Sequence, residues 1–259
     1  MQIEIKILIL VIYLFVSCKI NSNKITNNLE PKKKNLVVQT ERNLKLSIDS
    51  DTVFWKREYE IKIHNFNLTK IENLEQDFIF RFWNVGNLLE IKKTKSNIKG
   101  KVTYFVYEVW EDNYKADKFV KHFDLKQDTS EKIYSLITES KISDYPSDKF
   151  ISNWKQGFDG VTYIYEIVSN SNYSFKHYWT PNAQKNVKEA KSIMEFNDQI
   201  NNIINIKEQR TIFEKEIPFI SYTYPGSSSI ATKIVSKQEF KKYKRKRKRK
   251  PMANNQYKQ

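Results

Sequence analysis

Four side chains between residues 159 and 179 are of types that can do acid–base or binding chemistry. They are Asp159, Glu166, His177 and Trp179, and the first lies in the turn-like stretch Gly157-Phe158-Asp159-Gly160. A carboxylate among aromatic residues can take a raised pKa and act as a general acid or base. Hydrolysis that uses Glu166 or Asp159 is therefore one interpretation.

The same residues also have a structural interpretation, which we favour. In it Asp159-Gly160 forms a turn, Glu166 pairs with a basic residue of a neighbouring strand, and Trp179 belongs to the core. Two carboxylates seven residues apart, with no accompanying motif, are weak grounds for catalysis. We expect no catalytic residue, and we expect Asp159, Glu166, His177 and Trp179 to form a binding site at most.

Metal and cofactor chemistry is not indicated. The three histidines are His64, His122 and His177, no two of which lie at the spacing of metal ligands, and Cys18 is the only cysteine. The sequence contains neither a glycine-rich phosphate loop nor a Gly-x-Ser-x-Gly nucleophile elbow. We expect no metal site and no cofactor.

Cys18 lies two residues after an apolar run, Ile7–Val16. The run follows Lys6, and a polar segment follows Cys18. The run is shorter than the roughly 20 residues that span a bilayer. Its end, Phe15-Val16-Ser17-Cys18, resembles the lipobox of bacterial lipoproteins, although Phe15 stands where that family usually has leucine. The resemblance implies that residues 1–17 are a signal peptide and that Cys18 carries the lipid. The alternative is a buried segment with an ordinary thiol.

An envelope location follows from the lipobox resemblance. A single cysteine in an exported chain can form no internal disulfide, which a lipidated Cys18 explains. Lys19 is not the aspartate that retains many lipoproteins at the inner membrane, so we expect the outer membrane. The lipid anchor makes the membrane the expected partner, and each buried acyl CH₂ contributes about 0.8 kcal/mol.

The C-terminal region carries most of the net charge. The chain of 259 residues has a net charge of +15, and nine of these charges lie in one run of ten residues. The run consists of Lys241, Lys242, Lys244, Arg245, Lys246, Arg247, Lys248, Arg249 and Lys250, interrupted by Tyr243. We expect residues 236–259 to be a disordered tail that meets anionic lipid or another acidic envelope surface. In a cytosolic protein the same run would bind nucleic acid, which we consider a less favoured alternative.

The elements that must position the candidate residues are mostly strands. Period-two alternation and β-branched or aromatic residues predict strands at 58–64, 77–83, 88–91, 101–110, 119–125, 161–168, 173–179 and within 216–224. Helices are expected at about 128–141, with Asp128 and Glu131 as a capping box, and at 181–206, with Thr180 as N-cap. The spacers favour antiparallel pairing. We expect an α+β fold, an antiparallel sheet packed by two helices, in one domain over residues 51–235 after a flexible tether, 18–50.

The stretch from about residue 77 to 206 resembles uncharacterised bacterial exported proteins. The likeness rests on the Asp159-Gly160 turn, an aromatic residue two or three positions later, Glu166 and the Trp179-Thr180-Pro181 sequence after a hairpin, with Phe80-Arg81-Phe82-Trp83 and Glu90-Ile91 as earlier parts of the same module. It implies a domain extent and no activity. The sequence therefore predicts a cell-envelope lipoprotein with a binding or structural domain, and the alternative is an envelope hydrolase.

Overall fold

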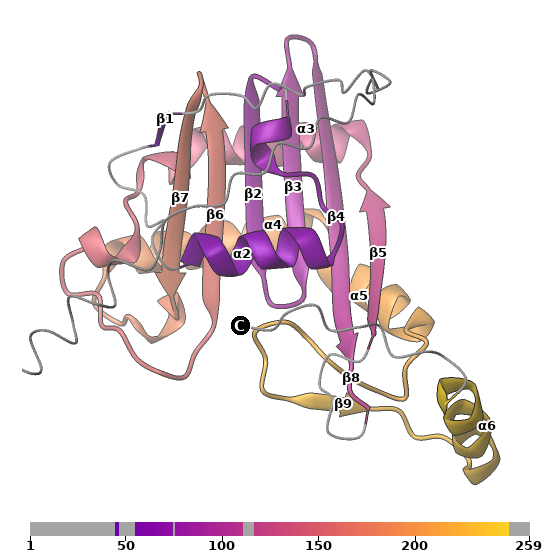
Figure 1. Ribbon diagram of the computed structural model, residues 1–259. Coiled ribbons are helices and arrows are strands. Elements are labelled where there is room, and N and C mark those ends of the chain that lie inside the picture. The colour runs from indigo at the N-terminus through magenta and orange to yellow at the C-terminus, as the bar shows by residue number, and fades with distance from the viewer. Residues whose placement is uncertain (1–44, 47–54, 75, 111–116, 249–259) are drawn as a thin grey trace, which may run out of the picture. The chain divides into compact units, whose positions relative to one another are not determined.

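Figure 1 shows the chain as a computed structural model. The structure describes residues 45–46, 55–74, 76–110 and 117–248, all within the unit Thr40–Gln259. The predicted signal peptide, Cys18 and most of the predicted tether lie outside the described residues, as do Arg249 and Lys250.

A nine-stranded sheet organises the described residues, in the order β1-β7-β6-β2-β3-β4-β8-β9, with β5 paired to β4. β1 runs parallel to β7, and the other pairings are antiparallel. The expected α+β class with an antiparallel sheet is thereby confirmed. The strands are β1 Lys45–Leu46, β2 Phe78–Asn84, β3 Asn87–Thr94, β4 Asn97–Glu108, β5 Lys118–Asp124, β6 Thr162–Ser169, β7 Asn172–Trp179, β8 Ser221–Thr223 and β9 Ile230–Thr232.

Tight turns set the register of the central strands. Two residues, Val85 and Gly86, join β2 to β3, and another two, Asn170 and Ser171, join β6 to β7. Asn170 and Ser171 both have positive φ, 49° and 65°. Positive φ at both central residues is the type I′ geometry, whose twist matches that of the flanking strands.

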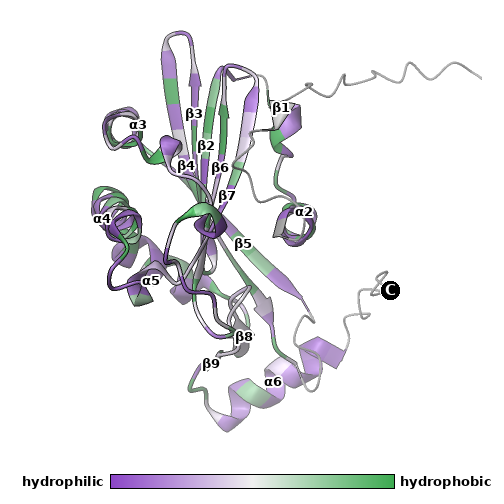
Figure 2. Ribbon diagram, turned by 90° about the vertical axis from the view of Figure 1, so that its left-hand side faces the viewer, coloured by the Kyte–Doolittle hydropathy of each residue, from purple (hydrophilic) through white to green (hydrophobic). Residues whose placement is uncertain are grey.

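Helices cover both faces of the sheet (Figures 1 and 2). One face lies under α2 (Trp55–Asn65), and the other under α3 (Gln127–Glu139), α4 (Lys188–Ile203) and α5 (Ile206–Glu216). Helix α6 (Lys237–Lys248) follows β9. Short 3₁₀ turns are η1 Ile71–Asn73, η2 Ile142–Asp144, η3 Asp148–Phe150 and η4 Pro181–Ala183.

Residues 58–64, predicted as a strand, belong to helix α2. Over so short a stretch, the alternation of charged and apolar residues fits both the two-residue period of a strand and the 3.6-residue period of a helix. Tyr59 and Ile63 in the segment and Phe66, directly after α2, are buried and spaced i, i+4 and i+7, which is one stripe of a helix. Phe66 stacks on Phe105 at 4.2 Å between ring centroids, and this packing favours the helix.

The helix predicted over 181–206 is divided into η4, α4 and α5. Thr180 does not cap it, because its φ of 42° is left-handed and its side chain makes no cap hydrogen bond. Asn205, with φ 50°, separates α4 from α5. The helix predicted at 128–141 is present as α3, but its N-cap position is Lys126, and Asp128 accepts instead from the Thr129 amide at 2.8 Å.

The basic tail is not disordered as far as Lys248, because residues 237–248 form α6. A reciprocal capping box begins the helix: the Ser236 amide donates to Glu239 at 2.8 Å, and the Glu239 amide donates to Ser236 Oγ at 3.2 Å. Glu239 in the first turn and basic residues in the last complement the helix dipole. The Ser236-x-x-Glu239 spacing is the signal that the sequence analysis missed.

Candidate functional site

Strand register places three of the four predicted site residues on one face of the sheet. Glu166 pairs with Phe175, and His177 and Trp179 follow Phe175 on β7 at two-residue spacing. Phe175 contacts Tyr59 of α2, so this is the face that α2 covers. Asp159 is exposed in the loop before β6.

A charge cluster lies buried on that face, formed by Arg81 of β2, Glu90 of β3 and Glu166 of β6. Arg81 Nε and Nη2 each lie 2.7 Å from Glu90 Oε2, and Nη1 lies 3.9 Å from Glu166 Oε2. Lys92 Nζ adds a second cation 2.7 Å from Glu90 Oε1. Two acids are thus balanced by two bases, as buried charges require.

Glu166 is held by two further donors. Trp83 Nε1 donates to its Oε2 at 2.6 Å, and Tyr173 OH donates to its Oε1 at 2.8 Å. Burial raises the pKa of Tyr173, and the Glu166 charge raises it further, so the phenol keeps its proton as a donor. Both carboxylate oxygens are therefore engaged, and Glu166 pairs with a basic strand residue, as the structural interpretation expects.

Arg81 and Glu90 stay ionised despite their burial. Burial alone would raise the pKa of Glu90, but Arg81 and Lys92 hold this pKa below its ordinary value. Burial alone would lower the pKa of Arg81, but Glu90 and Glu166 raise it above its ordinary value. Opposite charges at hydrogen-bond distance thus outweigh desolvation at both groups.

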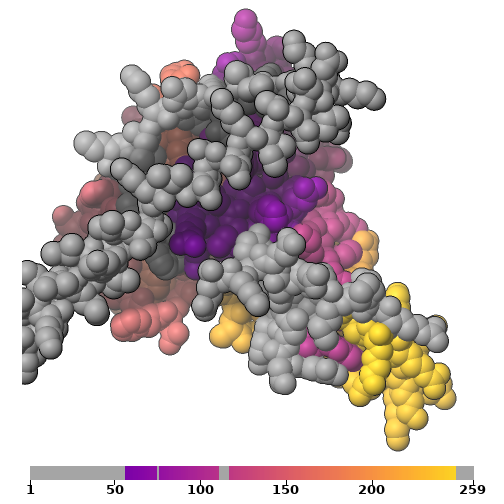
Figure 3. Space-filling model, viewed as in Figure 1, coloured from indigo at the N-terminus to yellow at the C-terminus, as the bar shows by residue number. Residues whose placement is uncertain are grey.

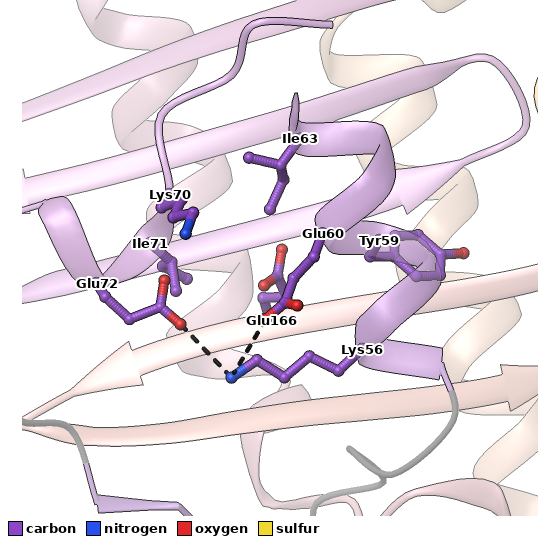
Figure 4. Close-up of a pocket in the computed structure, with 8 residues that line it drawn as sticks. All are labelled: Lys56, Tyr59, Glu60, Ile63, Lys70, Ile71, Glu72 and Glu166. Carbon is purple, nitrogen blue, oxygen red and sulfur yellow. Dashed lines mark ion pairs between the residues drawn. The ribbon is translucent and has the colours of Figure 1, made fainter. Parts of the chain in front are cut away.

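A small cavity of about 180 Å³, the α2 cavity, lies over Glu166 (Figure 4). At its edge Lys56 Nζ is 3.5 Å from a carboxylate oxygen of Glu72 and 3.9 Å from one of Glu60. Lys56, Glu60 and Glu72 are therefore paired with one another. The residues that line the cavity are Lys56, Tyr59, Glu60, Ile63, Lys70, Ile71, Glu72 and Glu166.

A second cavity, the end cavity, contains the other two predicted residues. It has a volume of about 290 Å³ and lies where β6 begins and β7 ends. Asp159 is not among its lining residues, although its neighbours are. The cavity is lined by Asp148, Lys149, Gln156, Gly157, Phe158, Gly160, Thr162, His177 and Trp179.

Asp148 orients His177 in the end cavity. Its Oδ2 lies 2.9 Å from His177 Nδ1 and also accepts from the Trp179 amide at 2.7 Å. Ser147 fixes η3 to the edge of β7, since its hydroxyl donates to the His177 carbonyl and accepts from the His177 amide. A carboxylate on Nδ1 fixes the tautomer and orientation of an imidazole.

The Asp-Gly turn lies directly on Trp179. A Cβ on Gly157 would lie 2.4 Å from the indole, and one on Gly160 would lie 1.8 Å from Thr180 Oγ1. Glycine is required at both positions because any side chain would push the loop off the ring. The loop and the indole therefore form one wall of the end cavity.

Strain and exposed apolar residues also gather at the end cavity. Thr180, directly after Trp179, is β-branched yet left-handed, at φ 42° and ψ 62°. Such a conformation costs energy, and strained residues cluster at functional sites. Three exposed apolar residues, Phe150, Phe158 and Val161, lie on the segments around the cavity, and Phe158 is 106% exposed.

The described residues contain no group of three or more His, Cys, Asp or Glu that could hold a metal ion. Within the same residues, none of the helices is both long and apolar enough to span a membrane. No protein-family model matches the chain, and a search of the curated proteins finds no match.

Sequence reasoning missed Asp148, and it noted Arg81 and Glu90 only as parts of the resemblance, with no role in a site. Arg81 had a usable signal, because it interrupts the otherwise apolar run Phe78–Trp83, and a charge in a strand buried on both faces demands a partner. Asp148 had none: its contacts with His177 and Trp179 depend on how η3 packs against β7.

Proposed function

We propose that this protein is a cell-envelope lipoprotein, anchored through Cys18, whose α+β domain binds a ligand in the end cavity. The lipobox-like sequence Phe15–Cys18 and the polar tether support the anchor. The binding role rests on one observation, the end cavity. Its lining includes His177, which Asp148 orients, Trp179 and the exposed Phe158. Concave sites that combine aromatic residues with a few fixed polar groups are typical of ligand binding.

A non-catalytic role agrees with the surroundings of Glu166 and Asp159, the two acidic residues that the sequence suggested for hydrolysis. Both oxygens of Glu166 accept hydrogen bonds, and Asp159 lines neither the α2 cavity nor the end cavity. Among the described residues that line the end cavity, Thr162 is the one with a hydroxyl group. It lies on a strand and not in a nucleophile elbow. The geometry gives no support to hydrolysis by Glu166 and Asp159.

The end cavity suits a compound with a flat or apolar face and a hydrogen-bonding edge. The flat face would pack on Trp179 and Phe158, since aromatic side chains offer large rigid contact area. The polar edge would meet His177 and Gln156. The exposed position of Phe158 means that it has contact area to bury on binding.

The binding role is tested by ligand-observed NMR with a set of ring compounds that each carry one polar group. We expect bound compounds to weaken at least threefold in Phe158→Ser and to be lost in His177→Ala. Ile234→Ser is the matched control, because Ile234 is also fully exposed, at 103%, but lies outside the cavity. Equal binding by all variants would contradict the proposal.

The anchor is tested separately by intact mass and detergent phase partition of the natively expressed chain. We expect a mature form that begins at Cys18, carries acyl mass and partitions with membranes. Cys18→Ala should remove the acyl mass and the partition. An unprocessed wild-type chain would refute the anchor without touching the binding site.

A further inference from the structure

A second surface lies at the C-terminal end of the described chain, on helix α6. One side of this helix is attached to the sheet: Tyr243 OH donates to Glu108 of β4, and Arg247 Nε lies 2.8 Å from Glu108 Oε2. The ring of Trp110 meets Tyr243 edge-on at 5.7 Å. Glu108 is 1% exposed, so a buried carboxylate fixes the helix.

The attachment determines which side of α6 faces outward. Tyr243 and Arg247 are spaced i and i+4, so they share the attached side. Lys241, Arg245 and Lys248 are spaced i, i+4 and i+7 on another side, and all three are exposed. The helix is mainly hydrophilic in Figure 2, and it forms the yellow lobe in Figure 3.

Exposed apolar residues lie within α6 and shortly before it in the chain. Ile234, three residues before the helix, is 103% exposed, and Phe240 in the helix and Ile230 in β9 are each 44% exposed. Exposed apolar side chains beside clustered Lys and Arg are typical of segments that lie on membrane surfaces. The basic groups meet lipid phosphates, and the apolar groups enter the acyl boundary.

We propose that the basic face of α6, with Ile234 beside it, docks on an anionic lipid surface. The inference rests on the proposed envelope location, but it requires no lipid on Cys18. Nucleic acid is the less suitable partner, because fully exposed Ile234 has nothing to gain from a phosphate backbone.

The test is co-sedimentation with vesicles of phosphatidylcholine, with and without phosphatidylglycerol. Every chain carries Cys18→Ala, so no acyl chain contributes, and the apolar run Ile7–Val16 contributes equally to each. One variant reverses the three outward charges, as Lys241→Glu/Arg245→Glu/Lys248→Glu. Each basic residue near an anionic surface contributes about fivefold in partition. Loss of the three positive charges alone corresponds to about a hundredfold, so we expect the triple variant to lose at least about a hundredfold on anionic vesicles and little on neutral ones.

The matched control reverses three exposed lysines elsewhere, as Lys132→Glu/Lys185→Glu/Lys188→Glu. Its partition to anionic vesicles should fall by less than about fivefold, the effect of one basic residue at the membrane. Ile234→Ser should weaken partition about tenfold, whereas Phe158→Ser should not change it. Equal losses in the two triple variants would overturn the proposal. So would tighter binding to a single-stranded RNA oligonucleotide than to anionic vesicles, together with no effect of Ile234→Ser. Neither result bears on the end cavity, and acyl mass on Cys18 is measured separately.

Discussion

The two faces of the sheet are stabilised in different ways. The face under α2 encloses the charge cluster of Arg81, Glu90 and Glu166 among aromatic rings. The face under α3 and α4 holds the larger apolar cluster, in which the Tyr165–Asn197 hydrogen bond is a buried neutral pair. The contribution of apolar burial can be summed over side chains, whereas that of a charge cluster depends on every partner being present.

Removal of Arg81 should have the largest effect on the stability of the α2 face. Arg81→Met leaves two buried carboxylates facing each other without their shared cation, and we expect a loss of about 3–5 kcal/mol in the free energy of unfolding. Urea unfolding at neutral pH measures it. The variant Arg81→Met/Glu90→Leu/Glu166→Gln removes the charges together and should recover most of the loss. If the triple variant is as unstable as Arg81→Met, the cost comes from packing and not from charge.

Two buried tyrosines give a matched comparison between the faces. Tyr173 donates to the charged Glu166 at 2.8 Å, and Tyr165 donates to the neutral Asn197 at 2.7 Å. Hydrogen bonds to charged groups contribute about 1.5–3 kcal/mol and neutral ones about 1 kcal/mol. We expect Tyr173→Phe to destabilise more than Tyr165→Phe in the same unfolding assay. The reverse order would mean that Trp83 and Arg81 satisfy Glu166 without Tyr173.

Acid should weaken the α2 face before the other face. The pKa of Glu90 is lower in the folded state than its ordinary value, so its contribution is fully present above the unfolded-state pKa. It is lost as pH falls through the lower, folded-state pKa, where Glu90 takes up a proton. Unfolding measured from neutral to acidic pH should therefore show a weaker acid dependence in Glu90→Gln. The α4 variant Phe196→Ala should keep the wild-type slope, and a change of slope in this control would argue against the assignment.

The extent of sequence prediction also differs between local and long-range features. Alternation or a dense run of β-branched and aromatic residues predicts β2, β3, β4, β6 and β7, because both signals lie in consecutive residues. Glu58–His64 fits two periods over seven residues, and only the packing of Phe66 on Phe105 selects the helix. Predicted helix 181–206 is divided by left-handed Asn205, which apolar spacing does not reveal.

The candidate site shows the same limit. His177 and Trp179, two of the four predicted site residues, lie two residues apart on one strand and so share a face. Glu166 is on the same face but belongs to the charge cluster, since Arg81 and Trp83 come from a strand more than 80 residues earlier. The spacing of two carboxylates in sequence says nothing about the distant residues that occupy them.

Surface pairs should show how far the difference between the faces extends. Lys56 bridges Glu72 and Glu60 at the edge of the α2 cavity, with 31% of its side chain exposed. Lys191 pairs with Glu195 at 3.7 Å on α4, and both of these side chains are exposed. Exposed pairs contribute little, and salt screens them. We expect Lys56→Met and Lys191→Met each to cost at most about 1 kcal/mol, and less at high salt, in urea unfolding at two ionic strengths. A cost for Lys56→Met that approaches that of Arg81→Met and resists salt would place Lys56 in the charge cluster. Small, salt-sensitive costs at both sites would confine the difference between the faces to their buried groups.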